Sequence, residues 1–151
     1  MTSLKTLVGA ATIALLASAC AAPTSQTGTV QVDEAWARAP LTADHPVPIY
    51  MRIVNNSDEP DQLISASSSV AGDVELQQTY AANAQAKMGV NTIEIPAGGE
   101  VVLSPNNLQV TLQSPNGLYR QGSTVPVSLT FARAGTIQIL ARVAAPGASG
   151  P

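Results

Sequence analysis

The sequence is poor in the residues on which most catalytic and disulfide chemistry depends. Its 151 residues include one cysteine, one histidine, one tryptophan and one phenylalanine, and only 11% are charged. A single cysteine excludes an intramolecular disulfide, and a single histidine without a G-x-S-x-G turn argues against a serine triad. With so few aromatics, a core must be built mainly from Val, Ile, Leu and Ala. We therefore expect a protein that is not an enzyme.

The first twenty residues contain an apolar run, Leu7–Leu16, that is too short to span a bilayer. Lys5 precedes this run, and the small residues Ala17-Ser18-Ala19 and then Cys20 follow it. A basic start, a short apolar segment and small residues before a cleavage point are typical of a signal peptide. We predict a signal peptide over residues 1–19.

Cys20 lies where a bacterial lipobox places the cysteine that is diacylated before cleavage, although Ala17 stands where Leu is commoner. We expect a lipidated Cys20 that anchors the chain to the cell membrane on its extracytoplasmic face and leaves no free thiol. The alternative is an ordinary signal peptide whose cleavage site adjoins a cysteine. The small, polar residues that follow Cys20 predict a flexible tether over 20–28, and PGASGP at the end predicts a disordered tail over 145–151.

The net charge is −3, and loss of residues 1–19 would remove only Lys5 and leave −4, with six basic and ten acidic residues. Nucleic acid and anionic lipid surfaces are poor partners for an acidic chain. We therefore expect no nucleic acid partner. The expected partners are the membrane, through the lipid anchor, and a protein of the cell envelope.

Apolar and polar residues alternate with a period of two between residues 29 and 144. The alternation is clear in Thr29–Asp33, Ile49–Ile53, Val125–Phe131 and Ile137–Val143. Clusters of Gly, Pro, Asn and Asp separate these runs at short intervals, as turns do between antiparallel strands. The pattern predicts a single all-β domain over 29–144 with about eight or nine strands, arranged as a Greek-key β-sandwich or barrel.

Several segments, taken in order, resemble the PCu(A)C family of periplasmic copper chaperones. They are Ala35–Arg38, Ala66–Ser68, Val70–Leu76, Ile93–Gly99, Leu103–Pro105 and Leu129–Phe131. No single segment is specific, but their order and spacing resemble the family from about Val30 to Val143. The resemblance implies a cupredoxin-like Greek-key fold, which agrees with the alternation.

The resemblance also implies the place of a copper site. The family has His at the positions of Gln77 and Gln109 and Met at that of Thr111, whereas Met88 keeps the family's residue. The stretch from Met88 to Gln109 is also one residue shorter than is usual. Cu(I) is soft and prefers imidazole and thioether, so amide and hydroxyl oxygens are weak ligands for it.

Gln109 and Thr111 stand at positions i and i+2 of one expected strand and therefore share a face. We predict that Gln77, Gln109 and Thr111 form a polar surface, the former-ligand patch, that keeps the geometry of the site with Met88 close by. No cofactor is expected to be held tightly. Cu(I) held through Met88 is the alternative.

His45 lies in an expected loop, Asp44-His45-Pro46. It could be a relocated metal ligand together with Met51 and Met88, but we favour an exposed loop histidine. Met51 alternates with Ile49 and Ile53, so we expect it to pack in the core.

Two other features have structural interpretations that we prefer. Trp36 is expected to anchor the core rather than form a stacking platform. Asp58, Glu59 and Asp61 are expected to form a solvated turn, because their spacing does not match a calcium loop.

Two functions from different classes remain. We favour a lipid-anchored, non-enzymatic binding or interaction module of the cell envelope whose copper ligands are mostly replaced. The alternative is a weak Cu(I) metallochaperone that uses Met88 with His45 or with a partner's ligand, and that delivers copper towards an oxidase copper centre.

Overall fold

The computed structural model describes residues 29–80 and 86–151, and these residues form ten β-strands and no helix. The predicted signal peptide (1–19), the lipidation site Cys20 and the tether to residue 28 lie outside the described residues. No helix of the described part is long and apolar enough to cross a membrane. The strands are β1 (Val30–Arg38), β2 (Val47–Asn55), β3 (Asp61–Ser67), β4 (Ala71–Thr79), β5 (Lys87–Gly89), β6 (Ile93–Ile95), β7 (Glu100–Leu103), β8 (Leu108–Pro115), β9 (Thr124–Phe131) and β10 (Gly135–Ala144).

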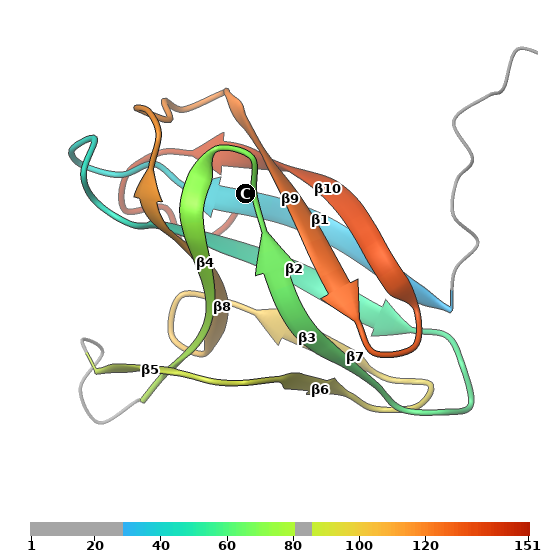
Figure 1. Ribbon diagram of the computed structural model, residues 1–151. Helices are drawn as coiled ribbons and strands as arrows, with labels where there is room; N and C mark the ends of the chain where they lie inside the picture. Colours follow the sequence, from blue (N-terminus) through green and yellow to red (C-terminus); the bar gives the residue numbers. More distant parts are fainter. Residues whose placement is uncertain (1–28, 81–85) are drawn as a thin grey trace, which may run out of the picture.

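All ten strands belong to one curled sheet (Figure 1). Their order is β5-β4-β8-β2-β1-β10-β9-β3-β6, and β7 also pairs with β2. The strand pairs are antiparallel except for β1 and β10, which run parallel with Trp36 opposite Arg142. The two end strands of this order, β5 and β6, follow each other directly in the chain and cross the foot of the molecule in Figure 1. The predicted all-β fold is confirmed.

The alternating residues identified in the sequence line the inside of the curled sheet. Burial is essentially complete for Val125, Val127, Leu129 and Phe131 of β9, for Ile49, Met51 and Ile53 of β2, and for Ala141 and Val143 of β10. Full burial of a Val, Leu, Ile or Phe side chain contributes about 1.5–3 kcal/mol. Together with other buried residues, these side chains form the main hydrophobic core.

A β-bulge in β1 turns Trp36 away from this core. Asp33 pairs with Arg52 and Trp36 with Tyr50, so β1 has one residue more than β2 between these pairs, and Glu34 adopts a positive φ of 52°. Trp36 is buried as expected, but it stacks on Tyr50, with the ring centroids 4.5 Å apart, on the sheet face opposite Ile49. The two rings form a second, smaller apolar cluster outside the main core.

The acidic turn before β3 is not the solvated turn that we expected. Asp61 is only 3% exposed, and its carboxylate accepts hydrogen bonds from the backbone N–H groups of Gln62, Arg133 and Ala134 at 2.7–2.9 Å. Glu59 forms an ion pair with the Arg133 side chain. Asp61 is buried because the turn between β9 and β10 presents N–H groups that need an acceptor.

Residues 145–151, for which disorder was predicted, lie beside the end of β1. The carbonyl oxygen of Ala148 accepts hydrogen bonds from Nε and Nη2 of Arg38 at 2.9 and 2.6 Å. The guanidinium of Arg38 also lies 5.6 Å from the centroid of the Tyr50 ring. Disorder of this tail stays a prediction.

Candidate functional site

The former-ligand patch lies where β4 pairs with β8. Gln77 is opposite Gln109 and Glu75 is opposite Thr111, whereas Leu76 is opposite the fully buried Val110. Successive side chains of a strand point to opposite faces. The pairing therefore brings Gln77, Gln109 and Thr111 together on the sheet face that points away from the main core.

These polar side chains bind one another. Nε2 of Gln109 donates to Oγ1 of Thr111 at 2.8 Å and to Oε1 of Gln77 at 3.2 Å, and the Thr111 hydroxyl donates to the same Gln77 oxygen at 2.9 Å. Gln77 and Gln113 each donate through Nε2 to Oε2 of Glu75, at 2.8 and 2.9 Å. We call these five residues the amide network.

The inner part of the amide network is closed to solvent. Gln109 is 0%, Thr111 2% and Gln77 9% exposed. The polar groups of the whole network are amides, a hydroxyl and a carboxylate. Such groups suit hydrogen bonding and hard cations rather than Cu(I). Gln77, Gln109 and Thr111 therefore form a buried hydrogen-bonded cluster rather than the polar surface that we predicted.

The structure does not bring Met88 to this network. In the short β4–β5 hairpin Gly89 is opposite Gln77, and Met88 is opposite Gln78. Since paired residues point to the same face, Met88 points to the face of Gln78, away from Gln77. Its side chain is 58% exposed. The residue of β5 beside Gln77 is a glycine, which offers no ligand.

The relocated site that would combine His45, Met51 and Met88 is not assembled either. His45 is exposed in its loop and its Nδ1 shares a hydrogen bond with Oγ1 of Thr42. Met51 is 2% exposed within the core, as its alternation predicted. Within residues 29–80 and 86–151, no three His, Cys, Asp or Glu side chains form a group that could hold a metal ion.

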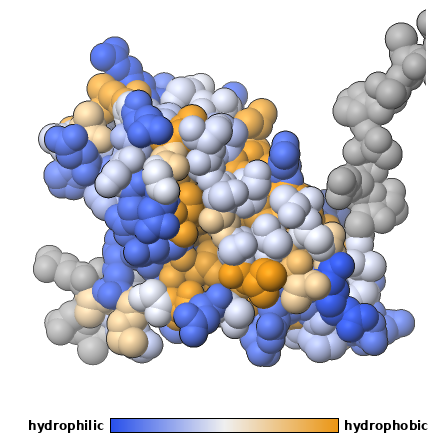
Figure 2. Space-filling model, viewed as in Figure 1, coloured by the Kyte–Doolittle hydropathy of each residue, from blue (hydrophilic) through white to orange (hydrophobic). Residues whose placement is uncertain are grey.

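A hollow of about 390 Å³ opens between β3 and β4 and is lined in part by Ile64, Val74 and Leu76. Figure 2 shows apolar surface gathered on this face of the molecule.

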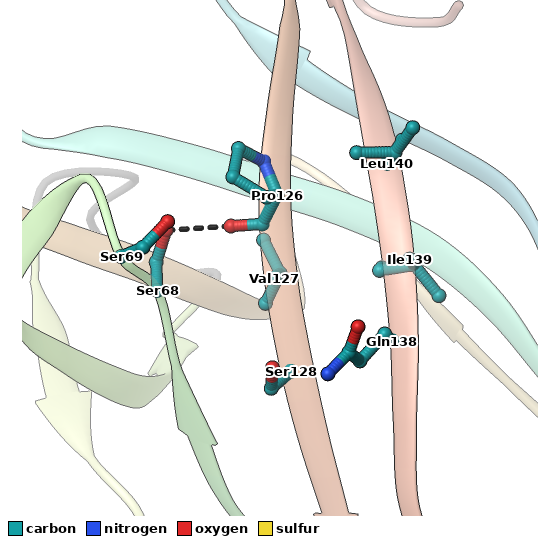
Figure 3. A pocket seen from close by; sticks show the side chains of 8 residues that line it. All are labelled: Ser68, Ser69, Pro126, Val127, Ser128, Gln138, Ile139 and Leu140. Atoms are coloured by element: carbon teal, nitrogen blue, oxygen red, sulfur yellow. Dashed lines mark hydrogen bonds between the residues drawn. The ribbon is translucent and has the colours of Figure 1, made fainter.

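Sequence reasoning did not find a second hollow, of about 490 Å³, over β9 and β10 (Figure 3). The Ser68 hydroxyl donates to the Pro126 carbonyl at its rim, and Leu140 is 67% exposed. Its lining contains no ionisable side chain. It can offer hydrogen bonds and apolar contact but no acid–base chemistry.

A family model and several solved structures match this chain. The sequence model of the LpqE-like lipoproteins matches residues 30–143. No functionally curated protein matches the chain. The copper-bound PCuAC domain of PmoF2 is similar in structure, with a TM-score of 0.69 and 28% identity over 79% of this chain and 95% of that one. Apo-DR1885 from Deinococcus radiodurans has a TM-score of 0.63 and 25% identity, covering 99% of this chain and 100% of its own.

Proposed function

Since the chain belongs to the LpqE-like lipoprotein family and has the fold of PCuAC domains, as its sequence resemblance predicted, we propose that it is a non-enzymatic binding module of the cell envelope. In this proposal a lipidated Cys20 holds the domain outside the cytoplasmic membrane. The domain keeps the scaffold of a copper carrier but not its copper site. Its partner is a protein or small ligand of the envelope.

The amide network is the observation that carries this proposal. A soft cation between Gln77, Gln109 and Thr111 would find only amide and hydroxyl groups as ligands. It would also have to break the hydrogen bonds that now join these side chains. Breaking a buried hydrogen bond leaves groups without partners, at a cost of about 1–3 kcal/mol each. The natural protein is therefore a poor Cu(I) ligand at this place.

A second candidate function is weak Cu(I) delivery, and the exposure of Met88 favours it. A thioether that is 58% exposed can meet a copper ion held by another protein. His45, which is also exposed, or a ligand of that other protein would complete the coordination. Solved PCuAC structures with bound copper, such as Cu(I)-DR1885, support this function by similarity, with a TM-score of 0.58.

Competition with a chromogenic Cu(I) chelator distinguishes the two functions. We expect the natural protein to leave copper on the chelator, and we expect the double variant His45→Ala, Met88→Ala to behave in the same way. Weak binding that the double variant loses would favour delivery through Met88. Tight, stoichiometric binding by the natural protein would contradict the proposed function.

A further inference from the structure

Two polar atoms on the face of the amide network lack the hydrogen bonds that buried polar atoms normally make. They are Oε1 of Gln109 and Oγ1 of Thr79, and neither finds a partner among the described residues. Gln109 is 0% and Thr79 5% exposed. Nearly all buried polar groups in native proteins bind either protein or ordered water, so these two atoms indicate an additional bound group.

The carboxylate of Glu75 determines which side-chain atom of Gln109 lacks a hydrogen-bond partner. A carboxylate only accepts hydrogen bonds, so Gln77 must turn its Nε2 to Glu75 and its Oε1 to Gln109. Gln109 must then present Nε2 to that oxygen, which leaves its Oε1 on the other side of the amide. Amide orientations are assigned from such networks, and here the carboxylate permits only one. The remaining atom is an acceptor and requires a donor.

Thr79 lies on the same sheet face as Gln109. Its N–H donates to the carbonyl of Asn107 at 2.9 Å, so Thr79 follows Gln77 on the same face of β4 and is diagonal to Gln109 across the β4–β8 pair. Nε2 of Gln109 is used by Thr111 and Gln77, so Oε1 is the part of this amide that remains for a further contact. A bound group there would meet one acceptor and one hydroxyl.

We infer that Gln109 and Thr79 together hold one internal water molecule that ends the amide network. Water can donate to the amide oxygen and can accept from or donate to the hydroxyl, and both of these atoms are shut off from bulk solvent. A charged ligand does not suit it, because neither atom carries charge. This inference stands apart from the proposed function, since the water would join β4 to β8 whatever the protein binds.

A crystal structure of the natural protein at a resolution that shows ordered water tests the inference. We expect one water within about 2.7–3.2 Å of both Oε1 of Gln109 and Oγ1 of Thr79. A water-selective nuclear Overhauser experiment should show contact with the Gln109 side chain in solution. A direct bond between the two residues, another side chain on Oε1 of Gln109, or an empty site would overturn the inference.

The variant Thr79→Val removes the hydroxyl and keeps the shape of the side chain. We expect the crystal structure of this variant to lack the ordered water at Gln109, or to show it clearly less occupied. Thr136→Val on the exposed part of β10 is the matched control and should leave the water in place. An unchanged water in Thr79→Val would show that Thr79 does not hold it.

Discussion

Several polar side chains of this domain are buried and bind residues that are distant in the sequence. The carboxylate of Asp61 accepts three backbone N–H groups, two of them from residues 72 and 73 positions further along the chain. The Gln109 side chain is entirely buried although it is polar. Such groups are held by partners that are distant in sequence, and their removal leaves those partners unpaired.

Asp61→Ala is expected to destabilise the fold by about 2–3 kcal/mol, because the carboxylate is lost and the N–H groups of Arg133 and Ala134 lose their acceptor. Denaturant unfolding followed by circular dichroism measures this change. The exposed Asp58→Ala, in the same turn, is the control and should alter stability little. Equal stability of the two variants would contradict the role given to Asp61.

The buried Tyr50 is expected to lower the free energy of unfolding at alkaline pH. Burial raises the pKa of its phenol above the ordinary value of 10.0, and the positive charge of Arg38 opposes the shift. The unfolded state therefore loses this proton first, so the stability present below about pH 10 is lost as the pH rises through the raised pKa. Unfolding free energies measured across this range should fall less in Tyr50→Phe than in the natural protein. The exposed Tyr80→Phe, as control, should follow the natural protein.

Some residue roles follow from the sequence and others depend on distant partners. The burial of Met51 could be predicted because its neighbours at i−2 and i+2 are isoleucines. The burial of Asp61 could not, because its partners belong to another turn. The bonds between Gln77 and Gln109 depend on the register of β4 against β8, which no local pattern fixes.

The strands themselves were predictable where they are long and alternate. β9 and β10 match their predicted runs, whereas β5, β6 and β7 have only three or four residues and carry too little pattern to be recognised. The bulge of β1 could not be predicted from a glycine either, because the residue with the positive φ is Glu34. Ten strands therefore form where about eight or nine were expected.

The register of the β4–β5 hairpin determines which residue of β5 could serve as a ligand in a rebuilt copper site. In the triple variant Gln77→His, Gln109→His, Thr111→Met, the residue of β5 on the same face is Gly89, not Met88. We expect the further change Gly89→Met to increase Cu(I) affinity by an order of magnitude or more, because it adds a thioether beside the two imidazoles. Chelator competition measures the affinity.

Met88→Ala in the triple variant is the matched control, since it removes the other β5 thioether. We expect it to change the affinity little. If Met88→Ala abolishes binding and Gly89→Met does not improve it, the β4–β5 register described here is wrong. The inherited site would then include Met88.

At the scale of the whole molecule, the domain has one apolar core, and its surface carries polar side chains and shallow hollows. The amide network lies outside the main core, on the opposite face of β4 and β8. We therefore expect the domain to fold without a bound metal ion.

The proposed lipid anchor at Cys20 leads to a prediction about where the molecule is held in the cell. We expect Cys20→Ala to leave the membrane fraction of cells that express the full chain, because the lipid anchor is lost. Intact mass should show a diacylated cysteine at the start of the natural mature protein. An unmodified mature chain that begins at another residue would contradict the anchor.

The measurement that tests the central claim most directly is a nuclear magnetic resonance spectrum of the Gln77 and Gln109 side-chain amides, with and without one equivalent of Cu(I). If the former-ligand patch is a closed hydrogen-bonded network, the Gln109 amide protons exchange slowly with water and the resonances of both amides stay in place when copper is added. Rapid exchange of the Gln109 amide, or a shift of these resonances with stoichiometric copper, would contradict the account.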